Sequence, residues 1–253
     1  MFDFIPSFKP FESLVLYLSH FEFWSDFIAF VSSFDGFSEA MIIKIAQSTD
    51  DTIYMVSLSV FFGLLIGLPI GVLLFTTRKG QILDCTILNN LISFAANFFR
   101  SIPFIILILW ILPFTALLMG TFIGKQAAVV PLSIGVAPLV ARMIENALLE
   151  VPKGLIEAAR SMGATPLQII YKVLLPESLP VIVNSMTITL ITLTGYIAMA
   201  GAVGAGGLGQ LAIQYGYISH KPAITDSVVY ILVIFTFFIQ FLGNTIVKRV
   251  THH

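Results

Sequence analysis

Gly204, Gly206 and Gly209 satisfy the spacing G-x-G-x-x-G, which in nucleotide-binding proteins lets the backbone approach a pyrophosphate closely. That chemistry needs a strand before the glycines and a helix after them in a β-α-β unit. Here the glycines follow a long apolar segment and precede a polar, aromatic loop. We therefore expect a flexible or tightly packed segment that lets this part of the chain open and close, and no cofactor site.

Other arrangements that could do chemistry are also missing from the sequence. There is no G-x-x-x-x-G-K-[ST] run to cradle a phosphate, so we expect no ATP site of that kind on this chain. The four histidines lack metal-ligand spacing within an apolar segment, and no Ser/His/Asp or paired-carboxylate arrangement lies there. A single cysteine, Cys85, excludes an intrachain disulfide. We expect no catalytic residue, no metal site and no enzymatic activity on this chain.

The composition places the chain in a membrane. Hydrophobic residues make up 57% of the 253 residues and charged residues only 11%, whereas soluble domains carry about 25% charged residues. Such a chain has too few charges to cover a water-facing surface. A net charge of -1 adds little to this conclusion.

Five segments are long and apolar enough to cross a bilayer, which takes about 20 residues in a helix. They are residues 53–77, 91–114, 122–141, 181–202 and 225–246. Each has to be a helix, because lipid offers no partner for backbone polar groups. The sequence therefore predicts an all-α integral membrane protein with a transmembrane domain over residues 52–246.

The distribution of Lys and Arg predicts the orientation. Eight lie after the first, third and fifth segments: Arg78, Lys79, Arg142, Lys153, Arg160, Lys172, Lys248 and Arg249. Four lie on the other side: Lys9, Lys44, Lys125 and Lys221. We therefore expect the tail 247–253 in the cytoplasm and the N-terminus outside.

Residues 1–51 form an N-terminal extension that we expect to be extracytoplasmic. Residues 11–34 are apolar and aromatic, but Glu22 and Asp26 interrupt them. A sixth span would bury each carboxylate at a cost of roughly 2.5–3.5 kcal/mol. This cost favours a helix lying in the membrane interface over a sixth span, which remains the alternative.

Two features inside the spans concern packing and charge. Gly63, Gly67 and Gly71 recur every four residues and predict one helix face that another helix approaches closely. Arg100 lies within the second span, where a charge is by default a functional candidate. The alternative that we favour is that the span starts near Ser101 and Arg100 reaches the cytoplasmic interface; Pro103 favours a helix start or a kink there.

Residues 142–180 are of mixed polarity in an otherwise apolar chain. Pro152 stands where a helix can begin, and apolar residues continue at helical spacing through Met162. Gly163 then provides a C-terminal stop, because it lacks the side chain that hinders a left-handed turn.

A second helix is expected directly after this turn. The Thr165 hydroxyl can cap it, and Pro166 at the first helical position loses no hydrogen bond. We expect this helix to end at Pro176. The sequence thus predicts a helix, a tight turn and a second helix, presented to the cytoplasm.

The hairpin resembles the EAA loop of ABC importer permeases. The match consists of Glu157-Ala158-Ala159, then Gly163, then Leu174-Leu175-Pro176. The resemblance implies a coupling helix that sits in a groove of an ATPase subunit, with Glu157 as a polar anchor, Ala158 and Ala159 allowing close approach, and Gly163 making the turn. The residues implied in this coupling are Glu157, Ala158, Ala159, Arg160, Gly163, Ala164, Thr165 and Pro166.

Longer stretches resemble the permeases of methionine importers. They are residues 100–115, 137–163 and 201–217, and the likeness runs from about Thr52 to the C-terminus. It implies a type I importer arrangement of two copies of the chain in the bacterial inner membrane. It also implies two cytoplasmic ATPase subunits that bind ATP and Mg, and an extracytoplasmic (lipo)protein that binds D- or L-methionine. Lipid is the surrounding partner, and nucleic acid is not expected.

The translocation path is the least specified part of this prediction. Tyr196, Met199, Gly204 and Gly206 are our candidates for its lining or gate, and the alternative is that Tyr196 and Met199 only fill space between helices. A permease for another small amino acid or an osmolyte is the nearest rival function. An ion-coupled secondary transporter would need acidic sites at mid-membrane, and only Asp226 comes near one.

Overall fold

The computed structural model describes residues 39–251, and every regular element in this part of the chain is a helix. The long helices are α3 (Glu39–Thr76), α4 (Thr86–Ser101), α5 (Phe104–Met119), α6 (Lys125–Leu149), α9 (Leu175–Ala200) and α11 (Pro222–Val250). The short ones are α7 (Lys153–Ser161), α8 (Pro166–Ile169), the π-helix η2 (Ile170–Leu174), the 3-10 turn η3 (Gly201–Val203), α10 (Gly207–Leu211) and the π-helix η4 (Ala212–Ile218). The expected all-α fold is confirmed.

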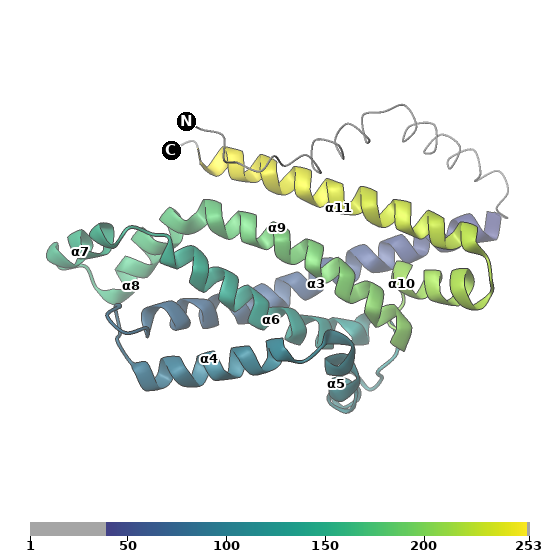
Figure 1. The fold of residues 1–253 in the computed structure, drawn as a ribbon, viewed down its shortest axis with the longest axis horizontal. Helices are drawn as coiled ribbons and strands as arrows, with labels where there is room; N and C mark the ends of the chain where they lie inside the picture. Colours follow the sequence, from purple (N-terminus) through teal and green to yellow (C-terminus); the bar gives the residue numbers. More distant parts are fainter. Residues whose placement is uncertain (1–38, 252–253) are drawn as a thin grey trace, which may run out of the picture. The chain divides into compact units, whose positions relative to one another are not determined.

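The residues from Gln47 onward form one unit, and the packing described below is that of this unit. The expected interfacial helix at residues 11–34 lies outside the described residues. In Figure 1, α7 and α8 lie together at one end of the unit, which we call the hairpin end. The segment that carries α10 lies at the opposite end, because α9 runs between the two (Figure 1).

The apolar helices account for five spans when one bent pair is counted as a single span. Four helical stretches are long and apolar enough to cross a bilayer: Ala40–Thr76, Lys125–Leu149, Pro166–Val203 and Pro222–Val250. The pair α4–α5 passes the same test together but bends by 106° between its two helices. The five-span expectation is therefore confirmed, with a broken second span.

The span expected over residues 91–114 consists of two helices, and the break lies at Pro103, where the sequence favours a helix start or a kink. Ile102 is extended (ψ 123°) and Pro103 has ψ 133°, so the helix stops and restarts at Phe104. The cause is local, because the proline ring clashes with a helical conformation of the residue before it. Arg100 is exposed in the last turn of α4, so a full helix precedes it, and a new helix begins at Phe104.

Several helices extend beyond the apolar segments that predicted them. α3 begins at Glu39 and not near Ile53, so Asp50 and Asp51 lie inside a helix. α6 continues to Leu149, beyond the expected end at residue 141. Hydropathy marks the part of a helix that crosses lipid, whereas backbone hydrogen bonding continues past the edge of the bilayer.

The second hairpin helix does not end at Pro176, contrary to our expectation. α8, η2 and α9 follow one another without a gap from Pro166 to Ala200. In the π-turn the N–H of Leu175 donates to the carbonyl of Ile170. Pro176 then falls in the first turn of α9, where its missing N–H costs little. The widened turn lets the helix pass a proline that would otherwise break it.

The glycine repeat of α3 packs against α6, as predicted. A Cβ atom placed on Gly67 would lie 2.7 Å from the carbonyl oxygen of Ala137, and one on Gly71 would lie 2.5 Å from that of Ala141. Such distances leave no space for a side chain. Small residues at this spacing let the two helix backbones approach each other closely.

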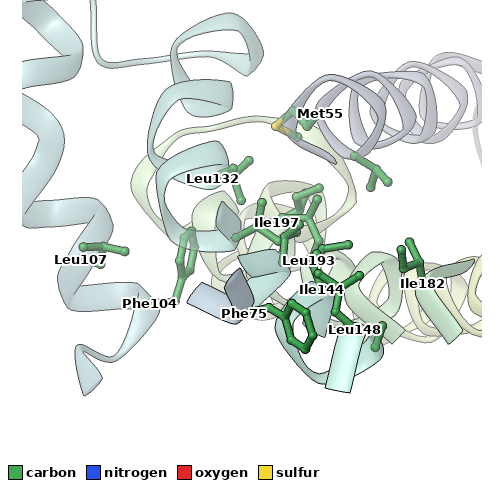
Figure 2. Close-up of a cluster of buried hydrophobic side chains, with 14 of the residues drawn as sticks. Met55, Phe75, Phe104, Leu107, Leu132, Ile144, Leu148, Ile182, Leu193 and Ile197 are labelled. Carbon is green, nitrogen blue, oxygen red and sulfur yellow. The ribbon is translucent and has the colours of Figure 1, made fainter. Parts of the chain in front are cut away.

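The core of the unit lies where α3, α6 and α9 meet. Figure 2 shows part of it: Met55 and Phe75 from α3, Leu132, Ile144 and Leu148 from α6, and Leu193 and Ile197 from α9. All of these side chains are at most 1% exposed. α6 also packs against α4 and α5, and α9 also packs against α11. α6 and α9 are therefore the two central helices.

Candidate functional site

The first hairpin helix, α7, has one face anchored in the core and one face exposed. Ile156 and Ala159 are only 6% and 4% exposed and belong to the central apolar cluster. Glu157, Ala158 and Arg160 are exposed. The anchored face fixes α7 against the unit, so its polar face is held in a fixed orientation.

The turn after α7 closes around Gly163. Its φ of +80° lies in the left-handed region that only glycine adopts easily. The N–H of Gly163 donates to the carbonyl of Arg160, and the N–H of Ala164 donates to that of Ala159. The predicted stop at Gly163 is where α7 ends, and the turn is fully hydrogen-bonded.

α8 begins with a reciprocal capping box. The N–H of Gln168 donates to the Thr165 hydroxyl oxygen at 3.4 Å, and the N–H of Thr165 donates to Oε1 of Gln168 at 2.9 Å. Pro166 occupies the first helical turn, as expected. Gln168 was not among the expected residues, although a Thr followed three residues later by Gln is the signature of this box.

The hairpin presents a surface suited to a protein partner. The eight predicted coupling residues lie on α7, the turn and the start of α8. Ala159 faces the core and Ala164 is half-buried, while the other six are exposed. Four large side chains on the same hairpin are also exposed, which is typical of a docking surface: Leu155, Met162, Leu167 and Tyr171.

The candidate path residues are not gathered in one place. Tyr196 stacks on Phe104, with ring centroids 4.3 Å apart. Met199 is 48% exposed, one turn further along α9. Gly204 and Gly206 lie in the loop between η3 and α10. The structure therefore joins Tyr196 to the start of α5 and assigns the two glycines to a separate loop.

The glycine loop is tied to α3 and to the start of α6. The N–H of Gly124 donates to the carbonyl of Gly204 at 2.9 Å. The N–H of Leu208 donates to the buried hydroxyl of Thr52 at 2.9 Å. Within the loop, the N–H of Gly206 donates to Oε1 of Gln210 at 2.7 Å. Of the two alternatives for this segment, the described contacts favour the tightly packed one.

An ion pair lies beside this loop. The ammonium group of Lys125 is 2.5 Å from a carboxylate oxygen of Asp51 and 4.0 Å from one of Asp50. It also lies 5.3 Å from the centre of the Tyr54 ring. The first turn of α6 is thus joined to α3 by charge as well as by the glycine loop.

A second charged group, not expected from the sequence, lies near the end of α6. It consists of Arg142, Glu145, Asn97, Ser93 and Arg78, and we call it the Arg142 cluster. Glu145 is 6% exposed and is the one buried charged residue in the described part of the chain. The signal was an Arg and a Glu three residues apart, directly after residue 141, where the third span was expected to end.

Known proteins match this arrangement over most of its length. Residues 67–252 match the family described as "Binding-protein-dependent transport system inner membrane component". The chain belongs to this family. It is thus a multi-pass transport subunit of the inner membrane. Asp226, the single acidic residue that suggested ion coupling, is exposed in the first turns of α11.

Individual members of the family are close in sequence. The "Probable D-methionine transport system permease protein MetI" of Vibrio cholerae is 53% identical over 205 residues, which cover 81% of this chain and 91% of that protein. The "D-methionine transport system permease protein MetI" of Escherichia coli K12 is 58% identical over 164 residues, covering 65% and 76%.

Solved structures of this transporter class share the fold. A chain of the MetNI methionine ABC transporter, in inward-facing conformations, has a TM-score of 0.84 at 56% identity and covers 85% of this chain and 100% of that one. An amino acid ABC transporter crystallised with histidines has a TM-score of 0.69 at 21% identity, covering 83% and 95%. The second likeness shows the fold alone.

Proposed function

We propose that this chain is the membrane-spanning permease of an ATP-driven importer that carries methionine, in its D form, its L form or both, into the cytoplasm. The observation that carries the proposal is the 56% identity with a chain of the MetNI methionine ABC transporter over that chain's whole length. The relatives named as D-methionine permeases support the same substrate.

The hairpin is the element that connects the permease to an ATPase. Glu157 and Arg160 are charged and exposed on α7, while buried Ile156 and Ala159 hold that helix against the core. A rigid, outward-facing polar helix of this kind fits a groove on a partner. ATP and Mg are bound by two such ATPase partners, and the chain itself holds neither.

The working transporter contains two copies of the chain. A methionine-binding (lipo)protein delivers the solute from outside, the ATPases bind ATP and close, and the coupling helices move with them. The two permeases then change from facing inward to facing outward, and hydrolysis resets them. This cycle requires the hairpin end and the C-terminus to be cytoplasmic, as the distribution of Lys and Arg also favours.

Solute uptake tests the proposal directly. We would reconstitute the chain with its ATPase and binding protein in vesicles and measure ATP-dependent uptake of radiolabelled D- and L-methionine. Glu157→Lys reverses the charge on the docking face, and we expect it to abolish uptake. Glu177→Lys makes the same change at an exposed position of α9 outside the hairpin, and we expect it to leave uptake nearly unchanged.

Each outcome has a clear meaning. Uptake of another amino acid or of an osmolyte in place of methionine would keep the importer and replace its substrate. Uptake without ATP, driven by an ion gradient, would overturn the proposal. Equal effects of the two charge reversals would remove Glu157 from the coupling surface.

A further inference from the structure

The guanidinium group of Arg142 joins two helices. Its Nη1 donates to Oε2 of Glu145, on α6 itself, at 2.6 Å. Its Nη2 donates to Oδ1 of Asn97 at 3.0 Å and to the carbonyl oxygen of Ser93 at 3.2 Å, both on α4. A planar guanidinium can use its two nitrogens in this way because they point in fixed, different directions.

Glu145 connects Arg142 to a second arginine, Arg78. Its side chain is 7% exposed, and its second oxygen lies 3.8 Å from a guanidinium nitrogen of Arg78, in the turn that follows α3. A buried ion pair of this kind adds little stability compared with apolar side chains of the same volume. What it does provide is a fixed geometry between the helices that carry its members.

The Arg142 cluster lies close to the hairpin along the chain. α6 ends at Leu149, and α7 begins at Lys153. The N–H groups of Glu150 and Val151 donate to the carbonyls of Ala147 and Leu148, and Val151 is only 6% exposed. The end of α6 is therefore connected to α7 by a short, hydrogen-bonded link.

The backbone connects the hairpin to two spans only. One arm leads through the short link into α6, and the other leads through η2 into α9 without a break. α4 has no such connection, since its chain neighbours are α5 and the loop after α3. Within residues 39–251, the polar contacts between α4 and α6 are those of Arg142.

We propose that Arg142 and Glu145 are a positioning pair that transmits movement of the coupling hairpin to α4, and through the break at Ile102–Pro103 to α5. The inference rests on the proposed function, because it assumes that an ATPase moves the hairpin. It adds a route to the broken second span that the hairpin's own two arms do not provide. Neither residue contacts a solute in this assignment.

Arg142→Lys is the variant that separates this role from simple packing. A lysine keeps the positive charge beside Glu145, so no buried carboxylate is left alone, but one ammonium group cannot reproduce the two-sided fork. Asn97→Ala removes the acceptor on α4. Asn89→Ala is the matched control, because Asn89 also lies on α4 but donates to Leu74 and Thr77 of the α3 end.

We would measure ATP hydrolysis and uptake in the assembled transporter. For Arg142→Lys and Asn97→Ala we expect uptake per ATP hydrolysed to fall about three- to thirtyfold, the usual range for residues that carry coupling. We expect hydrolysis itself to change less than about twofold and Asn89→Ala to behave like the native chain. Equal coupling ratios for Arg142→Lys and the native chain would overturn the proposal.

A distance measurement tests the same point without any solute. Cys85→Ser first removes the single cysteine of the chain. A nitroxide attached at Ser101→Cys on α4, or at Gly195→Cys on α9, then reports the distance between the two copies of that label. Both positions are exposed. In the native chain we expect ATP to change both distances. In Arg142→Lys, we expect ATP to change the α9 distance and to leave the α4 distance unchanged.

The two proposals fail in different ways. If the native chain shows both ATP-dependent distance changes but takes up no methionine, the substrate is wrong and the positioning role stands. If Arg142→Lys keeps the α4 change, the positioning role is wrong and the importer stands. If ATP changes no distance in the native chain, both are overturned.

Discussion

The rings of Phe104 and Tyr196 lie parallel, with an interplanar angle of 1° and centroids 4.3 Å apart. Phe104 is the first residue of α5, directly after the break in the second span, and Tyr196 lies in the last two turns of α9. A Cβ atom on Gly135 of α6 would lie 3.0 Å from the Phe104 ring. The start of α5 is therefore held between the two central helices.

This stack should stabilise the native arrangement measurably. Paired aromatic rings contribute about 0.5–1.5 kcal/mol beyond the area they bury. We expect a double-mutant cycle with Phe104→Leu and Tyr196→Leu, followed by thermal unfolding in detergent, to give a coupling energy in this range. Tyr196→Phe keeps the ring and should leave the unfolding temperature nearly unchanged. A coupling energy of zero would mean that the two rings are neighbours without mutual stabilisation.

The glycine face of α3 should tolerate no side chain. Gly67→Ala places a methyl group 2.7 Å from the Ala137 carbonyl oxygen, and overpacking of this kind costs roughly 1–3 kcal/mol. Gly195→Ala, on α9, meets no atom within 4 Å and should stabilise its helix by about 0.5–1 kcal/mol. Unfolding temperatures of the two purified variants should move in opposite directions. A higher unfolding temperature for Gly67→Ala would show that α3 and α6 can move apart enough to accommodate the methyl group.

The turn of the hairpin should depend on the backbone conformation of Gly163. At φ +80°, a residue with a Cβ costs about 1–2 kcal/mol, although open space surrounds the position. We expect Gly163→Val to reduce ATP-dependent uptake severalfold and Gly163→Asn to reduce it less, because Asn tolerates this region. Gly154→Ala is the control within the same hairpin, since it too has open space and has an ordinary φ. Normal uptake by Gly163→Val would show that the turn need not be rigid.

The hydroxyl of Thr52 should hold the glycine loop in place. It is the acceptor for the buried N–H of Leu208, and a buried donor left without an acceptor costs about 1–3 kcal/mol. Thr52→Val has nearly the same shape but no acceptor, so we expect lower thermal stability and faster proteolysis within residues 201–210. Thr52→Ser keeps the hydroxyl and should behave like the native chain. If the two variants are equally stable, the loop is held by its other contacts.

The sequence predicted those features of the hairpin and of α3 that depend on local chemistry. The cap at Thr165, the stop at Gly163 and the close helix contact at the α3 glycines all follow from residue types a few positions apart. The break before Phe104 was indicated by Pro103 as a kink, but its angle depends on how α5 packs against α6 and α9. Hydropathy alone therefore gives one span where the structure has two helices.

Other features depend on residues that are distant in the sequence. The third span was expected to end at residue 141, just before Arg142, whereas α6 continues to Leu149 and Arg142 forms hydrogen bonds to α4 from inside it. Likewise, Pro176 was read as a helix end because a π-turn is not visible in a hydropathy pattern. For Arg142, contacts with a helix that is distant in the sequence accompany the outcome that the local sequence does not predict.

The π-turn at Ile170–Leu174 also sets the angular phase between the hairpin and the span above it. An α-helix turns by about 100° per residue, and a π-turn holds one residue more than an α-turn. If all five residues were regular α-helix instead, the outward face of the hairpin would be rotated by about that angle around the axis of α9. The π-turn that precedes Pro176 thus also determines the direction in which Glu157 is presented relative to α9.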